Sequence, residues 1–345
     1  MKKLRGAIIG CGTIAKISHM PSLNSIKNVE MVAAIDSSIK KAKALSRQFH
    51  IERYYLDYGE IIDRNDIDFV CITTPPQFHS DIAIDMIKSG KHVLIEKPMA
   101  LTIEDAKGLI DISKKNDKIV GVVHNRRFYS KVREAHCAVK EGRLGDIYHA
   151  NFVSHLAGPS IGYPGADWHF NVEKSGGGVL MDQGTHTFDL IRYLLGDISS
   201  IYAVDSTIFN DFKTDTSIQA IVEVESGTKC TVELSWTCDF TECPITLWGS
   251  SGVVFIEPMF GYYEEVHQPR NPVKRWLNLT RTLTRFTTAF ATHDLENTHK
   301  LLISNFISSI SKGEKPLVTA EDGMKSIQAV AAAYESIRTR SIINL

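Results

Sequence analysis

The chain lacks paired cysteine motifs and carries almost no net charge. Its 345 residues include only six cysteines, none in a CxxC pair, and the formal net charge is −1 at pH 7. Scattered cysteines of this kind predict neither a zinc site nor a disulfide framework, and they are typical of reduced thiols in a cytoplasmic protein. A net charge near zero gives no electrostatic reason to expect a nucleic acid or a membrane surface as partner. We therefore expect no metal site, no nucleic acid and no membrane among the partners.

Long apolar runs are also missing. No segment approaches the roughly 20 consecutive apolar residues of a membrane span. The apolar run that follows the basic N-terminus is short and interrupted by glycine, unlike a signal peptide. The length of the chain exceeds what one hydrophobic core usually serves, so two domains are expected.

Strand and helix patterns alternate in the N-terminal third. Short apolar runs predict strands at Leu4–Gly10, Val29–Asp36, Asp68–Thr74, His92–Glu96 and Lys118–Val123. Segments with helical spacing, such as Ser80–Ser89 and Ile103–Lys115, lie between them. This alternation predicts a parallel sheet covered by helices on both faces.

The turn after the first strand fits a dinucleotide-binding pattern. It reads Gly10-Cys11-Gly12-Thr13-Ile14-Ala15 and opens a helix. Gly10 permits a tight turn, Gly12 lets the backbone approach a pyrophosphate, and the small Ala15 lets the helix pack closely on the strand. Free amides at the start of this helix would bind the phosphates. The alternative is an ordinary turn between a strand and a helix.

A carboxylate at the end of the second strand favours NAD as the cofactor. Asp36 lies where it can bind both ribose hydroxyls of NAD and repel the extra phosphate of NADP. No arginine follows it, although Lys40 and Lys41 lie close by. We expect NAD to be preferred and keep NADP as the alternative.

A proline-rich segment should lie at the carboxyl edge of the sheet. The chain continues after the third predicted strand as Thr73-Thr74-Pro75-Pro76-Gln77-Phe78-His79. Because prolines cannot continue a central strand, the chain must leave the sheet at this edge, which borders the ligand crevice in open α/β sheets. For Gln77 and Phe78, a simple turn and helix cap is an equally good interpretation.

A charged pair follows the next apolar strand. Glu96-Lys97-Pro98 comes directly after His92–Ile95, and burying two charges without a purpose is costly. We expect Lys97 to project into the crevice, where desolvation would lower its pKa. A surface lysine at a strand end is the alternative, and whether the peptide before Pro98 is cis stays open.

A glycine run precedes a carboxylate and an imidazole. The stretch Gly176–His186 places Asp182 and His186 one helical turn apart, and Asp189 would share their helix face. Taken alone, this spacing is equally typical of a solvated helix face. The glycine triplet favours a close approach of the backbone to another group.

Together these motifs resemble the Gfo/Idh/MocA family of NAD(P)-dependent sugar and cyclitol oxidoreductases, over nearly the whole chain. The similar segments are Gly10–Ala15, Thr73–His79, Glu96–Pro98, His124–Phe128, Gly176–His186 and Lys315–Gly323. The resemblance implies an α/β fold with an N-terminal Rossmann domain, residues 1–123. An α/β domain with a large open, mostly antiparallel sheet, residues 124–345, would follow, and its C-terminal helices could pack back on the first domain. It also implies a homodimer or homotetramer formed through that sheet.

The resemblance also implies a set of site residues. The catalytic candidates are Lys97, Asp182 and His186. The cofactor candidates are Gly10, Cys11, Gly12, Thr13, Ile14, Ala15, Asp36, Thr73, Thr74, Pro75, His79, Glu96, Lys97 and Asn125. The substrate candidates are Lys97, Arg126, Trp168, Asp182 and His186, with Arg127 and His169 at the boundary between cofactor and substrate. On this scheme His186 acts as general base and Lys97 stabilises the charge on the reacting oxygen, while Asp182 binds a neighbouring hydroxyl or orients His186.

Strand patterns continue through the second half of the chain. They cover Asp146–His155, Ile201–Phe209, Ser217–Val224, Thr228–Thr237 and Pro244–Trp248. The final segments, Leu295–Lys312 and Ala320–Thr339, are predicted as amphipathic covering helices. The basic segment Lys274–Ala291 fits either a helix that covers the sheet edge or a basic amphipathic helix for a membrane or an anionic substrate.

The predicted function is hydride transfer between NAD(P) and a secondary hydroxyl or ketone of a small polyol, which can be a sugar, a nucleotide sugar or an inositol. An NAD-dependent glycosidase is one alternative, although such relatives lack the lysine of the Glu-Lys-Pro motif. A catalytically silent NAD-binding regulator is another, although both Lys97 and His186 are present.

Overall fold

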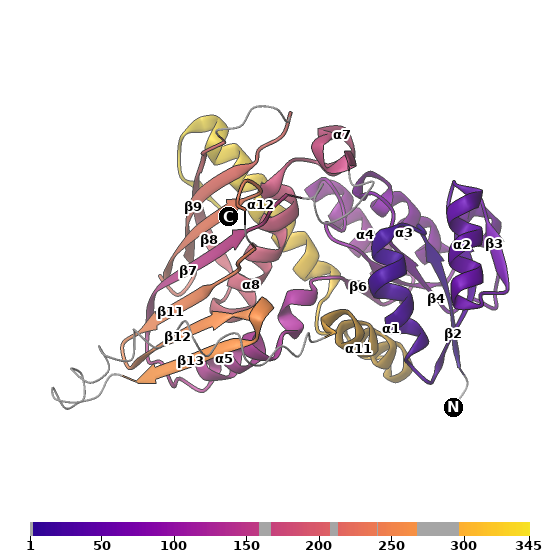
Figure 1. Cartoon of the computed structure of the whole chain (residues 1–345), viewed down its shortest axis with the longest axis horizontal. Helices are drawn as coiled ribbons and strands as arrows, with labels where there is room; N and C mark the ends of the chain where they lie inside the picture. The colour runs from indigo at the N-terminus through magenta and orange to yellow at the C-terminus, as the bar shows by residue number, and fades with distance from the viewer. Residues whose placement is uncertain (1–2, 159–166, 208–212, 240, 268–296) are drawn as a thin grey trace. The chain divides into compact units, whose positions relative to one another are not determined.

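The chain divides into two compact units in the computed structural model, which describes residues 3–158, 167–207, 213–239, 241–267 and 297–345 (Figure 1). The first unit comprises Met1–Asn125, Tyr163–Thr185 and Asn297–Gln328. The second comprises Arg126–Gly162, His186–Glu296 and Ala329–Leu345. The chain enters the second unit at Arg126 and returns to the first unit twice, at residues 163–185 and 297–328. The first of these two segments carries Asp182. The basic segment predicted at 274–291 lies outside the described residues.

The first unit is built on a six-stranded parallel sheet. Its strands are β1 (Leu4–Ile9), β2 (Val29–Ile35), β3 (Arg53–Tyr55), β4 (Phe69–Ile72), β5 (His92–Ile95) and β6 (Val120–Val122). The order is β3-β2-β1-β4-β5-β6, and every neighbouring pair is parallel. The order reverses between β1 and β4, which is the switch point where open α/β sheets bind ligands. All five predicted strands are confirmed to within two residues, whereas β3 was not predicted.

Helices α1 and α11 pack side by side in this unit, and so do α3 and α4. The helices are α1 (Met20–Asn24), α2 (Ile39–Phe49), α3 (His79–Lys88), α4 (Ile103–Lys115), α7 (Val172–Ser175) and α11 (Thr298–Lys312). Two π-helical turns, Ala15–His19 and Leu180–Gly184, precede α1 and α8 respectively. The predicted helix at 103–115 is confirmed with the same bounds. It begins at Ile103 because Thr102 caps it by accepting a hydrogen bond from the Asp105 amide.

The second unit is built on an eight-stranded sheet. Its strands are β7 (Ile147–His155), β8 (Ile198–Asp205), β9 (Ser217–Val224), β10 (Lys229–Ser235), β11 (Ile245–Gly249), β12 (Gly252–Glu257), β13 (Tyr262–His267) and β14 (Ile343–Asn344). The order is β13-β12-β11-β7-β10-β9-β8-β14, and only β7 and β10 pair in parallel. The prediction of a mostly antiparallel second sheet is confirmed. The described part of the predicted strand Ile201–Phe209 begins earlier, at Ile198, and ends at Asp205.

One face of this sheet is buried and the other is exposed. Strand β9 alternates, with Ile218, Ala220 and Val222 buried, while Ile221 on the opposite face is 54% exposed. The helices of this unit are α5 (Ser130–Lys140), α8 (Thr185–Leu195) and the second half of α12 (Ala320–Thr339). The Ser336 hydroxyl of α12 accepts a hydrogen bond from the Ala203 amide of β8. This contact fixes the second half of α12 against β8.

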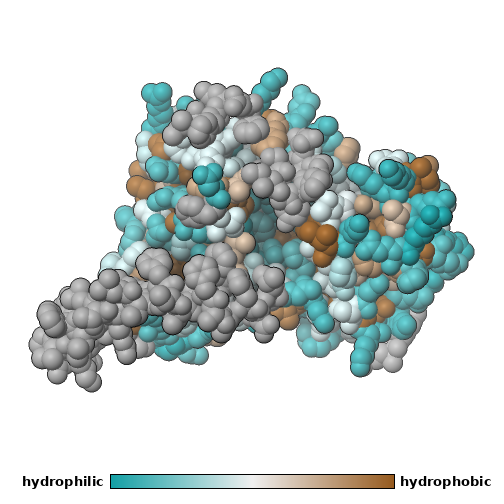
Figure 2. All heavy atoms as spheres, viewed as in Figure 1, coloured by the Kyte–Doolittle hydropathy of each residue, from teal (hydrophilic) through white to brown (hydrophobic). Residues whose placement is uncertain are grey.

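Polar and apolar side chains of the described residues are mixed on the face of the molecule that Figure 2 shows. None of the described helices is long and apolar enough to span a bilayer.

Candidate functional site

The glycine turn follows β1 at the switch point of the first sheet. Gly10 has a φ of +98°, and a Cβ at this position would lie 2.7 Å from backbone atoms of Thr73 and Thr74. The Thr73 hydroxyl donates a hydrogen bond to the Gly10 carbonyl at 2.6 Å. A side chain at position 10 would therefore push the turn away from the end of β4. A Cβ at Gly12, in contrast, would meet no atom within 4 Å.

Asp36 holds the glycine turn from the end of β2. One carboxylate oxygen accepts a hydrogen bond from the Cys11 amide at 2.8 Å, and the other accepts one from the Ser38 amide at 2.8 Å. Since a carboxylate offers about four lone-pair positions, acceptor capacity remains after these two bonds. The Cys11 thiol is buried below the turn, and burial raises its pKa to about 12. Cys11 is therefore a packing residue and not a nucleophile.

His79 braces the turns that follow β4 and β5. Its Nδ1 lies 2.7 Å from the Pro98 carbonyl oxygen and its Nε2 lies 2.7 Å from the Thr74 carbonyl oxygen. The side chain is buried, and burial lowers its pKa. Because both ring nitrogens contact backbone carbonyls, His79 can serve a cofactor only indirectly, by fixing the backbone at the edge of the sheet.

Lys97 and Asp182 form an ion pair within the first unit. The Lys97 ammonium contacts the Asp182 carboxylate and donates a second hydrogen bond to the Asp182 carbonyl oxygen at 3.1 Å. The side chains are 16% and 17% exposed. The peptide between Lys97 and Pro98 is cis. Lys97 was predicted at this edge, but the predicted partner of Asp182 was a substrate hydroxyl or His186.

The charges around Asp182 keep its carboxyl group ionised. Burial acts to raise the pKa of Asp182, but the positive charges of Lys97 and His169 outweigh it and lower the pKa to about 2. The Gln183 amide donates a further hydrogen bond to the second carboxylate oxygen at 2.6 Å. Trp168 stacks on His169 with ring centroids 3.6 Å apart. The first unit therefore brings Lys97, Asp182 and the Trp168–His169 pair into one neighbourhood.

Glu96 and Asn125 bind other parts of the first unit. One Glu96 carboxylate oxygen lies 2.7 Å from Nε2 of the buried His19, and the other accepts the Lys97 amide at 3.2 Å. The Asn125 amide donates a hydrogen bond to the Thr298 hydroxyl at 3.0 Å, at the start of α11. Both side chains thus link the carboxyl edge of the sheet to neighbouring helices.

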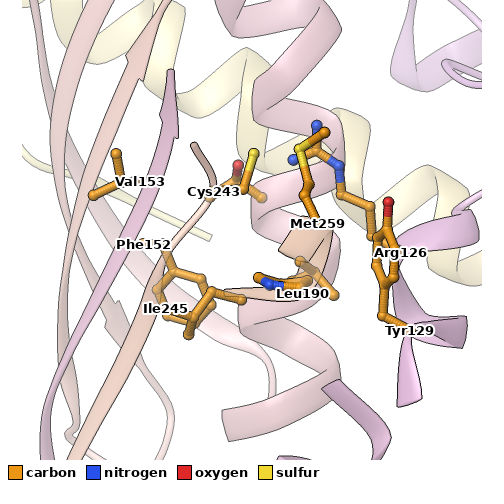
Figure 3. Close-up of a pocket in the computed structure, with 10 residues that line it drawn as sticks. Arg126, Tyr129, Phe152, Val153, Leu190, Cys243, Ile245 and Met259 are labelled. Atoms are coloured by element: carbon orange, nitrogen blue, oxygen red, sulfur yellow. The ribbon is translucent and has the colours of Figure 1, made fainter. Parts of the chain in front are cut away.

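The second unit holds the predicted residues Arg126, Arg127 and His186. His186 is a buried residue in the first turn of α8. The Arg126 guanidinium donates a long hydrogen bond of 3.4 Å to the Ser154 hydroxyl, and Arg126 borders a small cavity. Arg126 and Tyr129 lie on one side of this cavity, and Phe152, Val153 and Ile245 lie on the sheet side (Figure 3).

Asp189, which was grouped with Asp182 and His186 by helical spacing, is buried in the second unit rather than exposed to solvent. The Asp189 side chain is 1% exposed and pairs with Arg127 through two hydrogen bonds, of 2.8 Å and 2.5 Å. Arg127 lies over the Tyr193 ring at 5.2 Å. A paired carboxylate can occupy the core of the unit, whereas the sequence pattern shows only that the residue is polar.

Comparisons with known proteins identify the family. Residues 4–124 match the family described as an oxidoreductase family with an NAD-binding Rossmann fold, and residues 132–255 match the Gfo/Idh/MocA C-terminal domain. The chain belongs to the Gfo/Idh/MocA family. It is an NAD-binding oxidoreductase, and the predicted family, fold and enzyme class are confirmed.

Relatives of this Gfo/Idh/MocA protein extend over its full length. It is 25% identical over 349 residues to the myo-inositol 2-dehydrogenase of Thermotoga maritima, with 99% of this chain and 98% of the relative covered. It is 26% identical to the D-glucoside 3-dehydrogenase of Escherichia coli, with 99% and 97% covered. In fold it is similar to the WlbA dehydrogenase of Bordetella pertussis, solved in complex with NADH and UDP-GlcNAcA, with a TM-score of 0.85, 23% identity and coverage of 100% and 99%.

The residues of the glycine turn fit a bound NAD. The open space at Gly12 leaves room for a phosphate against the backbone, at the start of a helix whose amides favour anions. The Thr74 hydroxyl is buried and has no hydrogen-bond partner among the described residues. A buried hydroxyl without a partner at this edge is suited to a ligand that supplies one. Among the described residues, no cluster of His, Cys, Asp or Glu is arranged to hold a metal ion.

Two side chains that contact the predicted site were not among the predicted residues. His19 binds Glu96, and Gln183 binds Asp182. Gln183 lies in the motif itself, so its position beside Asp182 offered a signal. His19 lies four residues after Ala15, and nothing local to its sequence indicates its partner.

Proposed function

We propose that this protein oxidises a secondary hydroxyl of a sugar, a nucleotide sugar or an inositol with NAD, or catalyses the reverse reduction. The observation that carries the proposal is the shielded Lys97–Asp182 ion pair at the carboxyl edge of the NAD-binding sheet. The names of the relatives, which include an inositol dehydrogenase and a glucoside dehydrogenase, support a polyol as the substrate. Asp36 supports NAD as the preferred cofactor, with NADP as the alternative.

Each charged residue has a distinct task in this reaction. Bound NAD supplies the acceptor for the hydride that leaves the carbinol carbon. Lys97 donates a hydrogen bond to the substrate oxygen and stabilises its developing negative charge. His186 accepts the hydroxyl proton, since an imidazole is a base near neutral pH. Asp182 fixes the Lys97 ammonium, and Gln183 in turn fixes the Asp182 carboxylate.

Substitution of Lys97 tests this proposal. NADH formation is followed by absorbance with a panel of inositols, aldoses and nucleotide sugars, with NADP run in parallel. Lys97→Met keeps the apolar stem of the side chain. We expect turnover to fall about 100-fold or more, because the contact to the developing charge is lost, while the affinity for NAD stays within about threefold, because the glycine turn is unchanged. Lys91→Met is the matched control, because Lys91 is a buried lysine at the amino end of the same strand and donates to the Ile62 carbonyl.

Three outcomes would contradict the proposal. Unchanged turnover in Lys97→Met would exclude Lys97 from the chemistry. Release of an aglycone without net NADH would favour a glycosidase. NAD binding without turnover of any compound in the panel would favour a regulator.

We also propose that the protein forms a homodimer or homotetramer through the second sheet. The exposed face of that sheet carries Tyr202, Val204 and Ile221, which are between 37% and 54% exposed. Exposed apolar side chains that lie next to one another are favourable to cover. Light scattering with Ile221→Lys, compared with wild type, measures the assembly. The six cysteines are free, which supports a reducing compartment, and we propose the cytoplasm.

A further inference from the structure

Glu96 and Lys97 are consecutive residues that are each bound by a different π-helical turn. The turn Ala15–His19 ends at His19, which contacts Glu96, and the turn Leu180–Gly184 contains Asp182, which contacts Lys97. These are the two π-helical turns among the described residues. Such turns are rare and frequently lie at functional sites. The proposed mechanism uses only the second of them, so the role of the first is open.

His19 is a buried partner that fixes the Glu96 carboxylate. Its side chain is 0% exposed, and Nε2 lies 2.7 Å from Glu96 Oε1. Because an ionised carboxylate only accepts hydrogen bonds, Nε2 must carry the proton. Burial acts to raise the pKa of Glu96, but His19, His299 and Lys97 outweigh it and lower the pKa to about 2. The carboxylate is thus held ionised, and its orientation is fixed by His19.

The other Glu96 oxygen transmits this orientation to the lysine. Oε2 accepts a hydrogen bond from the backbone amide of Lys97 at 3.2 Å. The carboxylate therefore folds back over the peptide from which the Lys97 side chain departs. His299, at the start of α11, packs edge-on against His19 with ring centroids 5.9 Å apart. This contact restricts the movement of the His19 imidazole.

We infer that His19 is a positioning residue for Lys97 and that it acts through Glu96. The inference rests on the proposed role of Lys97 in hydride transfer. His19 does not touch the reacting atoms in this scheme, and it holds the peptide of Lys97 so that the ammonium meets the substrate oxygen. A displacement of about 1 Å at a reacting group can lower turnover about 100-fold. The contact between His19 and Glu96 should therefore have a measurable effect on turnover, although neither side chain touches the substrate in this scheme.

Two substitutions at one position separate positioning from simple packing. His19→Leu preserves bulk and removes the donor, and we expect kcat to fall about 10- to 100-fold while the Kd for NAD stays within about threefold. The amide nitrogen of His19→Gln can take the place of Nε2, so this variant should recover most of the lost turnover. His92→Leu is the control, because His92 accepts a hydrogen bond from the Ile119 amide at the opposite end of β5.

The pKa of Glu96 gives a second readout. The ionisable groups that interact with Glu96 are His19, His299, Lys97, His79 and Cys71. Burial acts to raise the pKa of Glu96, and the interactions with His19, His299 and Lys97 act to lower it. When His19 is replaced by leucine, one of these opposing interactions is lost, so the pKa of Glu96 rises. In a direct ¹³C NMR titration of the Glu96 carboxyl group, the pKa should therefore be higher in His19→Leu than in wild type, and it should stay in place in His92→Leu.

A measurement on the protein without cofactor distinguishes failure of this inference from failure of the proposed function. The lysines are reductively methylated with ¹³C-formaldehyde, and the Lys97 signal is assigned by its loss in Lys97→Arg. If wild type oxidises no polyol, the proposed function fails, yet the Lys97 signal should still shift and titrate differently in His19→Leu. The inference is overturned if this signal is identical in wild type and His19→Leu, or if His92→Leu loses as much turnover as His19→Leu.

Discussion

Replacing Asp182 with asparagine removes the negative charge beside Lys97 and keeps the shape of the side chain. The pKa of Asp182 is about 2, against a usual value of 3.8. One pKa unit corresponds to about 1.4 kcal/mol, so the ionised form contributes about 2 kcal/mol to the free energy of unfolding at neutral pH. Asparagine also turns a donor toward either Lys97 or Gln183, which already donate to the two carboxylate oxygens. We therefore expect Asp182→Asn to lose about 2 kcal/mol or more at pH 7.

The sign of the pH dependence follows from the lowered pKa. A carboxyl group whose pKa is lower in the folded state stabilises the protein above its unfolded pKa, and this stabilisation is lost as the pH falls toward the folded pKa. The contribution is complete above pH 5, falls to about half near pH 3 and is nearly absent at pH 2. The difference between wild type and Asp182→Asn should shrink in the same way.

Urea unfolding of wild type and Asp182→Asn at pH 7, 5 and 3 measures this difference. Asp111→Asn, which removes an exposed carboxylate from α4 in the same unit, is the matched control and should change stability by less than about 0.5 kcal/mol. Equal stability of Asp182→Asn and wild type at pH 7 would refute the electrostatic reasoning. A difference at pH 3 as large as that at pH 7 would instead assign the loss to packing.

Two further predictions concern Asp189 and Asp36. Asp189→Asn leaves the Arg127 charge buried without a carboxylate and should destabilise the second unit by about 3–5 kcal/mol in urea unfolding, whereas the double variant Arg127→Met, Asp189→Leu should recover most of that loss. A double variant less stable than the single one would contradict this. Asp36→Asn keeps one acceptor for the Cys11 amide but removes the charge, so the preference for NAD over NADP should fall about tenfold in calorimetric titrations, and an unchanged ratio of the two affinities would exclude a role for this charge.

The strands of the first sheet could be predicted because each central strand is buried on both faces and reads as a continuous apolar run. Strand β3 could not, since Arg53–Tyr55 is a short edge strand with exposed side chains. In the second sheet, β13 contains two glutamates and does not read as a strand. The antiparallel partner β12 supplies its hydrogen bonds and decides its conformation.

The position of the site at the sheet edge could be predicted from the sequence. The pairs of side chains that form the site could not. Lys97 follows an apolar strand, so a local pattern places it at the carboxyl edge of the sheet. Its partner Asp182 lies 85 residues away, and the contact between His19 and Glu96 spans 77 residues. Such pairings depend on which helix packs on which strand end. The helical spacing that grouped Asp182 with Asp189 could not show that their partners differ, Lys97 in one case and Arg127 in the other.

The glycine run explains how Asp182 comes close to Lys97. Gly176 has a φ of +80°, and a Cβ at this position would lie 2.7 Å from the side chain of Leu101. The close approach expected from the glycine triplet is thus to the protein itself, at the segment that follows Lys97 and Pro98. Because the backbone passes so near Leu101, the π-helical turn that begins four residues later can bring Asp182 to the Lys97 ammonium. Gly176 therefore allows the close backbone approach that Asp182 needs in order to contact Lys97.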